Sequence, residues 1–116
     1  MKFLALTVLS LSFISCSFQK SKLPKPSGDR TSLDAPVPDE AMAKKYQFDL
    51  DQVGLGHAIY MRKCGECHLH VLPDEVTSNN WHVIVPGMSW NAGISPAEEK
   101  ALLAYLQVAA KEKPKS

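Results

Sequence analysis

The feature of this 116-residue chain that most constrains its fold is the five-residue motif Cys64-Gly65-Glu66-Cys67-His68. Two thiols three positions apart are followed directly by an imidazole, which concentrates three metal-binding or covalently reactive groups in one short segment. The chain has one other cysteine, Cys16, and no second Cys-x-x-Cys pair. A domain of roughly 70 residues seldom builds a sufficient core from side chains alone. We therefore expect the group bound at this motif to organise the fold around it.

Three kinds of chemistry are compatible with the motif. Two cysteines at this spacing can join both vinyl groups along one edge of a haem, with His68 lying beneath the iron. A zinc site would need His70 or His82 as further ligands, and the usual zinc motifs contain a second cysteine pair. A dithiol redox centre usually opens a helix after a strand, whereas this motif follows a helical pattern. The residues favour one covalent haem c, held through Cys64 and Cys67.

The residues before the motif have a helical pattern. We predict a helix from Leu50 to Cys64, with Asp49 or Asp51 as its N-cap. Gly56, Tyr60 and Cys64 are four residues apart and share one face, where the glycine would permit close approach of another helix. The alternative is that the glycines mark a loop before a shorter helix.

Two further helices are predicted after the motif. One runs from Ser78 to Val85 and should end or kink at Pro86-Gly87, because proline lacks the backbone donor and disfavours helix in the preceding residue. The other runs from Pro96 to about Ala110 behind a capping box, Ser95-Pro96-Ala97-Glu98. No alternating strand pattern is present. The predicted fold class is all-α.

The N-terminal residues have the layout of an export signal. Lys2 precedes an apolar run from Phe3 to Ile14, which is too short to span a bilayer as a helix. The segment ending at Cys16 resembles a bacterial lipoprotein processing site, in which that cysteine receives the lipid; an ordinary signal peptide cut near Ser15 is the alternative. We expect a signal peptide over 1–15, a Pro/Ser/Lys-rich tether over 16–40, a folded domain over 41–112 and a disordered tail over 113–116.

From Ala41 to Leu106 the chain resembles a small bacterial monohaem cytochrome c domain, similar to class I. The resemblance rests on the haem motif and on a running order of shared residues: Ala43-Lys44-Lys45-Tyr46, Gly56, Ile59-Tyr60, Pro73, Trp81, Ile84-Val85-Pro86-Gly87-Met88, Ser95, Glu98 and Tyr105-Leu106. It implies three to four helices around one haem, with Met88 as the second axial ligand opposite His68. His70 and His82 are reserve ligands. The Trp81 indole could pack on the haem with its N–H toward a propionate, or simply pack in the core.

The resemblance implies electron transfer between protein partners at a membrane. Alternatives are a gas sensor with a labile Met88 and a zinc or dithiol module. The net charge of +1 gives no nucleic-acid footprint, and the sequence shows no catalytic nucleophile, so we expect no enzyme activity. We expect an exported, lipid-anchored protein at the periplasmic face of a membrane or at the cell surface, with an unidentified redox partner.

Overall fold

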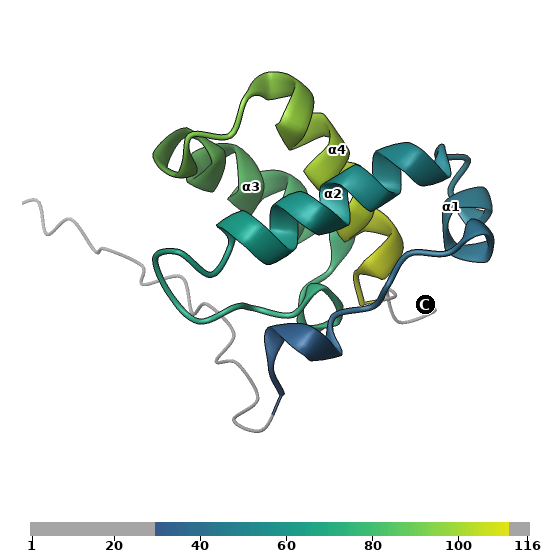
Figure 1. Cartoon of the computed structure of the whole chain (residues 1–116), viewed down its shortest axis with the longest axis horizontal. Coiled ribbons are helices and arrows are strands. Elements are labelled where there is room, and N and C mark those ends of the chain that lie inside the picture. The colour runs from purple at the N-terminus through teal and green to yellow at the C-terminus, as the bar shows by residue number, and fades with distance from the viewer. Residues whose placement is uncertain (1–29, 112–116) are drawn as a thin grey trace, which may run out of the picture.

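The computed structural model describes residues 30–111, and this part of the chain is all-α, as predicted (Figure 1). Within it no strand is formed, and a single isolated bridge pairs Thr77 with Lys111. The predicted signal peptide, Cys16 and the C-terminal tail lie outside the described residues. The four helices are α1 (Glu40–Lys45), α2 (Leu50–Lys63), α3 (Ser78–Ala92) and α4 (Pro96–Ala109), with short 3₁₀ helices at Ser32–Asp34 and Pro73–Glu75.

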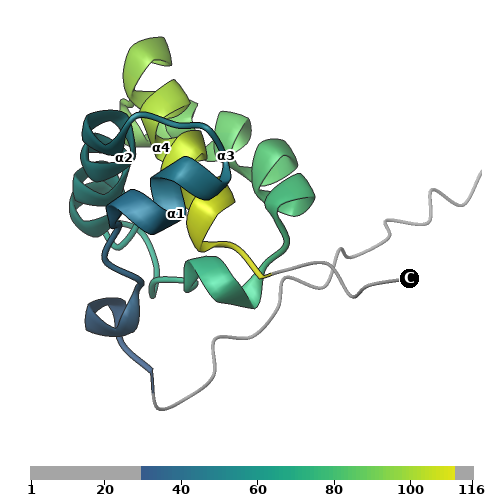
Figure 2. The same cartoon turned by 90° about the vertical axis from the view of Figure 1, so that its right-hand side faces the viewer.

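Helix α4 is the centre of the domain and lies between α2 and α3 (Figure 2). Its capping box forms as predicted: the Ser95 backbone N–H donates to the Glu98 carboxylate at 2.9 Å, and the Glu98 N–H donates to Ser95 Oγ at 3.3 Å. Because α4 has neighbours on both sides, its buried surface is wider than a single stripe. The buried residues are Ala101, Leu102, Ala104, Tyr105, Leu106, Val108 and Ala109.

Helix α2 crosses α4 at Gly56, which confirms the predicted close approach and excludes the alternative of a loop. A Cβ atom on Gly56 would overlap the backbone carbonyl of Ala101 and would lie 2.7 Å from Tyr105 Cβ. Asp49, rather than Asp51, is the N-cap, and its carboxylate accepts from the backbone N–H of Asp51 at 2.9 Å. The helix then runs unbroken to Lys63, directly before the first cysteine of the motif.

Helix α3 differs from the prediction because it does not end at Pro86 but continues to Ala92. Proline removes one backbone hydrogen bond, and the carbonyl of His82 that loses it belongs to an exposed residue that water can reach. Val85 and Ser89 are buried on either side of the proline, so packing against α4 holds both halves of the helix. The helix ends at Ala92, and the next residue is Gly93, whose φ of 64° suits a glycine C-cap.

Residues 30–39, which we expected to belong to the tether, pack against the helices. The Tyr105 hydroxyl donates to the Pro36 carbonyl at 2.9 Å, and Ala35 is buried. Arg30 donates two hydrogen bonds to the Asp74 carboxylate at 3.1 and 3.0 Å, and this contact raises the pKa of the guanidinium. The helix that follows, α1, was not predicted; it is capped by Asp39.

Candidate functional site

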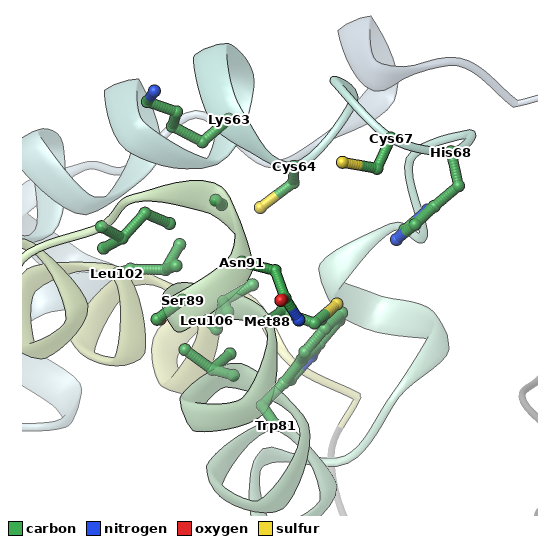
Figure 3. Close-up of a pocket in the computed structure, with 13 residues that line it drawn as sticks. Lys63, Cys64, Cys67, His68, Trp81, Met88, Ser89, Asn91, Leu102 and Leu106 are labelled. Carbon is green, nitrogen blue, oxygen red and sulfur yellow. The ribbon is translucent and has the colours of Figure 1, made fainter.

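The four residues predicted to form the site surround one pocket between the end of α2, α3 and α4 (Figure 3). The pocket has a cavity volume of about 210 Å³, and a neighbouring cavity of about 50 Å³ shares part of its wall. Apart from the reactive groups the wall is largely apolar. Its main residues are Cys64, Cys67, His68, Trp81, Val85, Met88, Ile94, Leu102 and Leu106.

The two thiols reach the pocket from the end of α2. The Cys64 backbone N–H donates to the Tyr60 carbonyl at 3.1 Å, so this residue continues the last turn of the helix. Its thiol is largely buried, and desolvation raises its pKa to about 11. Cys67 lies on the turn that follows and is exposed. Figure 3 shows both sulfurs on the same side of the pocket, as attachment along one edge of a haem requires.

The His68 ring points toward the pocket from the turn (Figure 3). Its Nδ1 atom lies 2.7 Å from the Leu69 carbonyl oxygen. A carbonyl only accepts hydrogen bonds, so Nδ1 carries the hydrogen and Nε2 keeps a lone pair for a metal. Leu69 is the residue directly after the motif. Such a bond fixes the orientation of a ligating imidazole.

Met88 lines both cavities and is half-buried. Its sulfur points into the space that the His68 ring faces (Figure 3). It lies within α3, because this helix does not end at Pro86-Gly87 as we predicted. The register of α3 places it there instead, one position before the buried Ser89. Its role as an axial ligand stays a prediction.

The reserve ligands His70 and His82 do not lie at the pocket. The ring of His70 packs on Gly65 and on the Tyr60 ring, and its Nε2 is 3.2 Å from the Tyr60 carbonyl. His82 is exposed and borders a separate surface hollow beside α4. Neither residue is placed to replace Met88 in this arrangement.

Trp81 forms part of the pocket wall, but its N–H is already used. The indole Nε1 donates to the Pro73 carbonyl at 3.0 Å, and the side chain is buried. This contact contradicts the hypothesis that the indole donates to a haem propionate. The ring can still pack against a bound group.

Ser89 is a functional candidate that sequence reasoning missed. It is only 2% exposed, lines the pocket, and its Oγ has no hydrogen-bond partner among the described residues. Buried hydroxyls in native proteins nearly always have a partner. The spacing in the sequence could have identified it. Trp81, Val85 and Ser89 are four residues apart and so share one helix face, and of the three only Ser89 carries a hydroxyl.

The residues present fit a haem better than they fit zinc. Two thiols, one imidazole and one thioether open onto an apolar wall, which suits a large apolar ring bound at its edge and on both faces. Among residues 30–111 no group of three or more His, Cys, Asp or Glu side chains is placed to hold a metal ion by itself. The structure therefore gives the zinc alternative no support.

Comparison with known proteins agrees with this geometry. Residues 60–116 match the family described as dihaem cytochrome c, a region that begins just before the motif and includes α3 and α4. No curated protein and no solved structure matches the chain. The match supports a cytochrome c-type haem domain. It also supports haem-based electron transfer as the general activity.

None of the helices within residues 30–111 is both long and apolar enough to cross a membrane.

Proposed function

We propose that the protein is a one-electron carrier with a single haem c, attached through Cys64 and Cys67 and ligated by His68 and Met88. The observation that carries this proposal is the convergence of two thiols, an imidazole and a thioether on one apolar pocket. Bound haem would supply a reversible one-electron change at iron. With two protein ligands the iron has no open position, so we propose no catalytic activity of the protein's own.

The proposal of a single haem rests on the attachment sites within these 116 residues. The family is described as dihaem, but this chain has three cysteines and one Cys-x-x-Cys-His motif. The remaining cysteine, Cys16, lies 48 positions before Cys64 (64 − 16), and the residue directly after it is Ser17 rather than histidine. One covalent haem per chain is therefore the composition that we propose.

The residues around the pocket would set the properties of the bound group. The Leu69 carbonyl orients the His68 imidazole by accepting from Nδ1, which would leave Nε2 to bind the iron. A Met88 thioether would be a weaker electron donor to the iron than a second imidazole, so it would favour the reduced state and raise the potential. Leu102 and Leu106 keep water from the inner wall of the pocket. These features suit a carrier better than a site for substrates.

We further propose that the domain works outside the cytoplasm, anchored through a lipid on Cys16, and exchanges electrons with a larger redox protein. The support is the signal-like N-terminus and the cysteine at its end. A labelled fatty acid should be incorporated into the wild-type chain and not into a Cys16→Ser variant. Equal labelling of both would remove the anchor from this proposal.

Met88 ligation is tested with paired methionine variants of the haem-loaded protein. Met88→Leu removes the thioether at the pocket, whereas Met61→Leu removes one that is packed against the core. We expect the Met88 variant to bind CO in the reduced state and to have a lower potential, while wild type and the Met61 control bind no CO at micromolar concentrations. Wild-type binding equal to that of the Met88 variant would favour the gas-sensor alternative.

A further inference from the structure

The turn between the two cysteines packs against the His70 ring at a glycine. A Cβ atom on Gly65 would overlap His70 Cε1 and would lie 2.7 Å from its Nδ1, closer than real Cβ contacts come. Gly65 is not in the left-handed region, since among residues 30–111 the only glycine with positive φ is Gly93. The backbone at Gly65 would therefore accept another residue. The His70 imidazole, and not the backbone conformation, excludes a side chain at position 65.

The His70 ring is held from two other directions. Its Nε2 lies 3.2 Å from the Tyr60 carbonyl, and because a carbonyl only accepts, this nitrogen is the donor. The ring also meets the Tyr60 ring edge-on, with centroids 5.0 Å apart. Tyr60 is 1% exposed and its hydroxyl donates to the Val71 carbonyl at 3.0 Å. The ring therefore cannot give way without losing these contacts.

The Tyr60 carbonyl is also the acceptor for the Cys64 backbone N–H, at 3.1 Å. The Tyr60 carbonyl oxygen therefore holds both the Cys64 backbone and the His70 ring. The His70 ring in turn contacts Gly65, the residue after Cys64. Cys67 lies three residues further along the same turn, on the far side of Gly65. The path of the chain between the two thiols is set by this small group of contacts.

We propose that His70 is a positioning residue for haem attachment: it shapes the Cys64–Cys67 turn through contact with Gly65, so that both thiols face one edge of the pocket. This inference rests on the proposed function, and it explains why His70 is not a ligand. Attachment adds each thiol across a vinyl group, with sulfur bonded to one carbon and hydrogen to the other, so no oxidant or reductant is needed. If the turn is displaced, one thiol should miss its vinyl group and remain free.

The test is a double-mutant cycle made in cells that attach haem c. Gly65→Ala, His70→Ala and the double variant are purified with bound haem, treated with an alkylating reagent, and weighed intact. The intact mass of each chain then shows whether haem is attached and how many of the two thiols, Cys64 and Cys67, remain free. Gly54→Ala is the matched control, because Gly54 is a glycine of α2 whose added Cβ would meet nothing within 4 Å.

We expect Gly65→Ala to lower the doubly attached fraction at least about twofold, the lower end of coupling between residues in contact, with one alkylated thiol in the remainder. His70→Ala alone should also lower the doubly attached fraction, though less than Gly65→Ala does, because the turn then loses the ring that fixes its path. In the double variant the fraction should rise to the level of His70→Ala alone, because the obstructing ring is gone. A His70→Ala protein that attaches haem as wild type does would show that the ring has no positioning role. Gly54→Ala should attach haem as wild type does. A normal Gly65→Ala protein, or a double variant no better than the single one, would overturn the inference. A wild-type chain without haem would overturn the proposed function instead.

Discussion

The two halves of this domain complete their interiors by different means. Where α2 crosses α4, side chains fill the space: Ile59, Tyr60 and Tyr105 are at most 1% exposed, and Gly56 admits no further atom. On the α3 side the wall of the pocket is open, Cys67 and His68 are exposed, and Ser89 keeps a buried hydroxyl without a partner among the described residues. The first half is a finished core, whereas the second needs a bound group to complete it.

The difference between the two halves separates the residues that stabilise the domain from the residues that line the pocket. The pocket of about 210 Å³ leaves apolar side chains without packing partners, which is costly in a domain whose small core supplies only about 3–5 kcal/mol. The α2–α4 crossing is the closely packed part of the domain, and α2 ends directly before Cys64. The α3 side contributes Met88 and Trp81 to the pocket from one helix.

The largest effect should come from removing the attachment sites. In a Cys64→Ala, Cys67→Ala double variant we expect no covalently bound haem and loss of amide hydrogen-exchange protection in α3 and in residues 65–77. Protection at the α2–α4 crossing should fall less, because that half is packed by its own side chains. Equal loss in both halves, measured by hydrogen-exchange mass spectrometry, would show that the distinction between them is false.

The finished core is tested by adding one methyl group. Gly56→Ala should lower the free energy of unfolding by about 2 kcal/mol, because its Cβ overlaps backbone that cannot move aside. Gly54→Ala on the same helix should instead be neutral or stabilising by up to about 1 kcal/mol, because alanine favours helix. Denaturant titration of the haem-loaded proteins measures both. Similar values for the two variants would mean that the crossing is not tightly packed.

Substitution of Ser89 tests whether a bound group completes the packing on the α3 side. If the haem or an ordered water supplies the missing acceptor, Ser89→Ala should lower the free energy of unfolding of the haem-loaded protein by about 1 kcal/mol. Thermal and denaturant unfolding measure this change. A variant more stable than wild type would indicate that the hydroxyl stays without a partner when the haem is bound.

The smallest expected effect is a pH dependence of the free energy of unfolding, which arises from His57 at the α2–α4 crossing. His57 is half-buried, its ring centroid lies 5.0 Å from that of Tyr105, and desolvation lowers its pKa from 6.5. The folded state therefore disfavours the protonated ring, so its contribution is complete above pH 6.5 and is lost as the pH falls through the lowered pKa. The stability difference between wild type and His57→Gln should shrink or reverse toward acid. A difference that is constant between pH 5 and 8 would contradict the assignment.

Short sequence patterns were enough to predict the helices whose ends and faces are set by neighbouring residues in the sequence. The capping box before Pro96 and the face shared by Gly56 and Tyr60 were enough to place α4 and α2. The all-α class and the four residues around the pocket were also expected, because the haem motif and the resemblance pointed to them.

Tertiary contacts decided the rest. Pro86 read alone indicates a helix end, but the buried residues on either side of it keep α3 intact. Residues 30–39 read as a Pro-rich tether because they bury little among themselves, yet the Tyr105 hydroxyl and Asp74 hold them to the domain. The packing of His70 on Gly65 had no sequence signal, because it depends on how the turn folds back onto α2.

The most direct test of the central claim is the intact mass of the protein purified from cells that attach haem c, taken together with oxidised and reduced absorption spectra. We predict a mass gain of one haem per chain, no alkylatable thiol at Cys64 or Cys67, and a reversible c-type spectrum. A colourless protein with both thiols free would contradict the account.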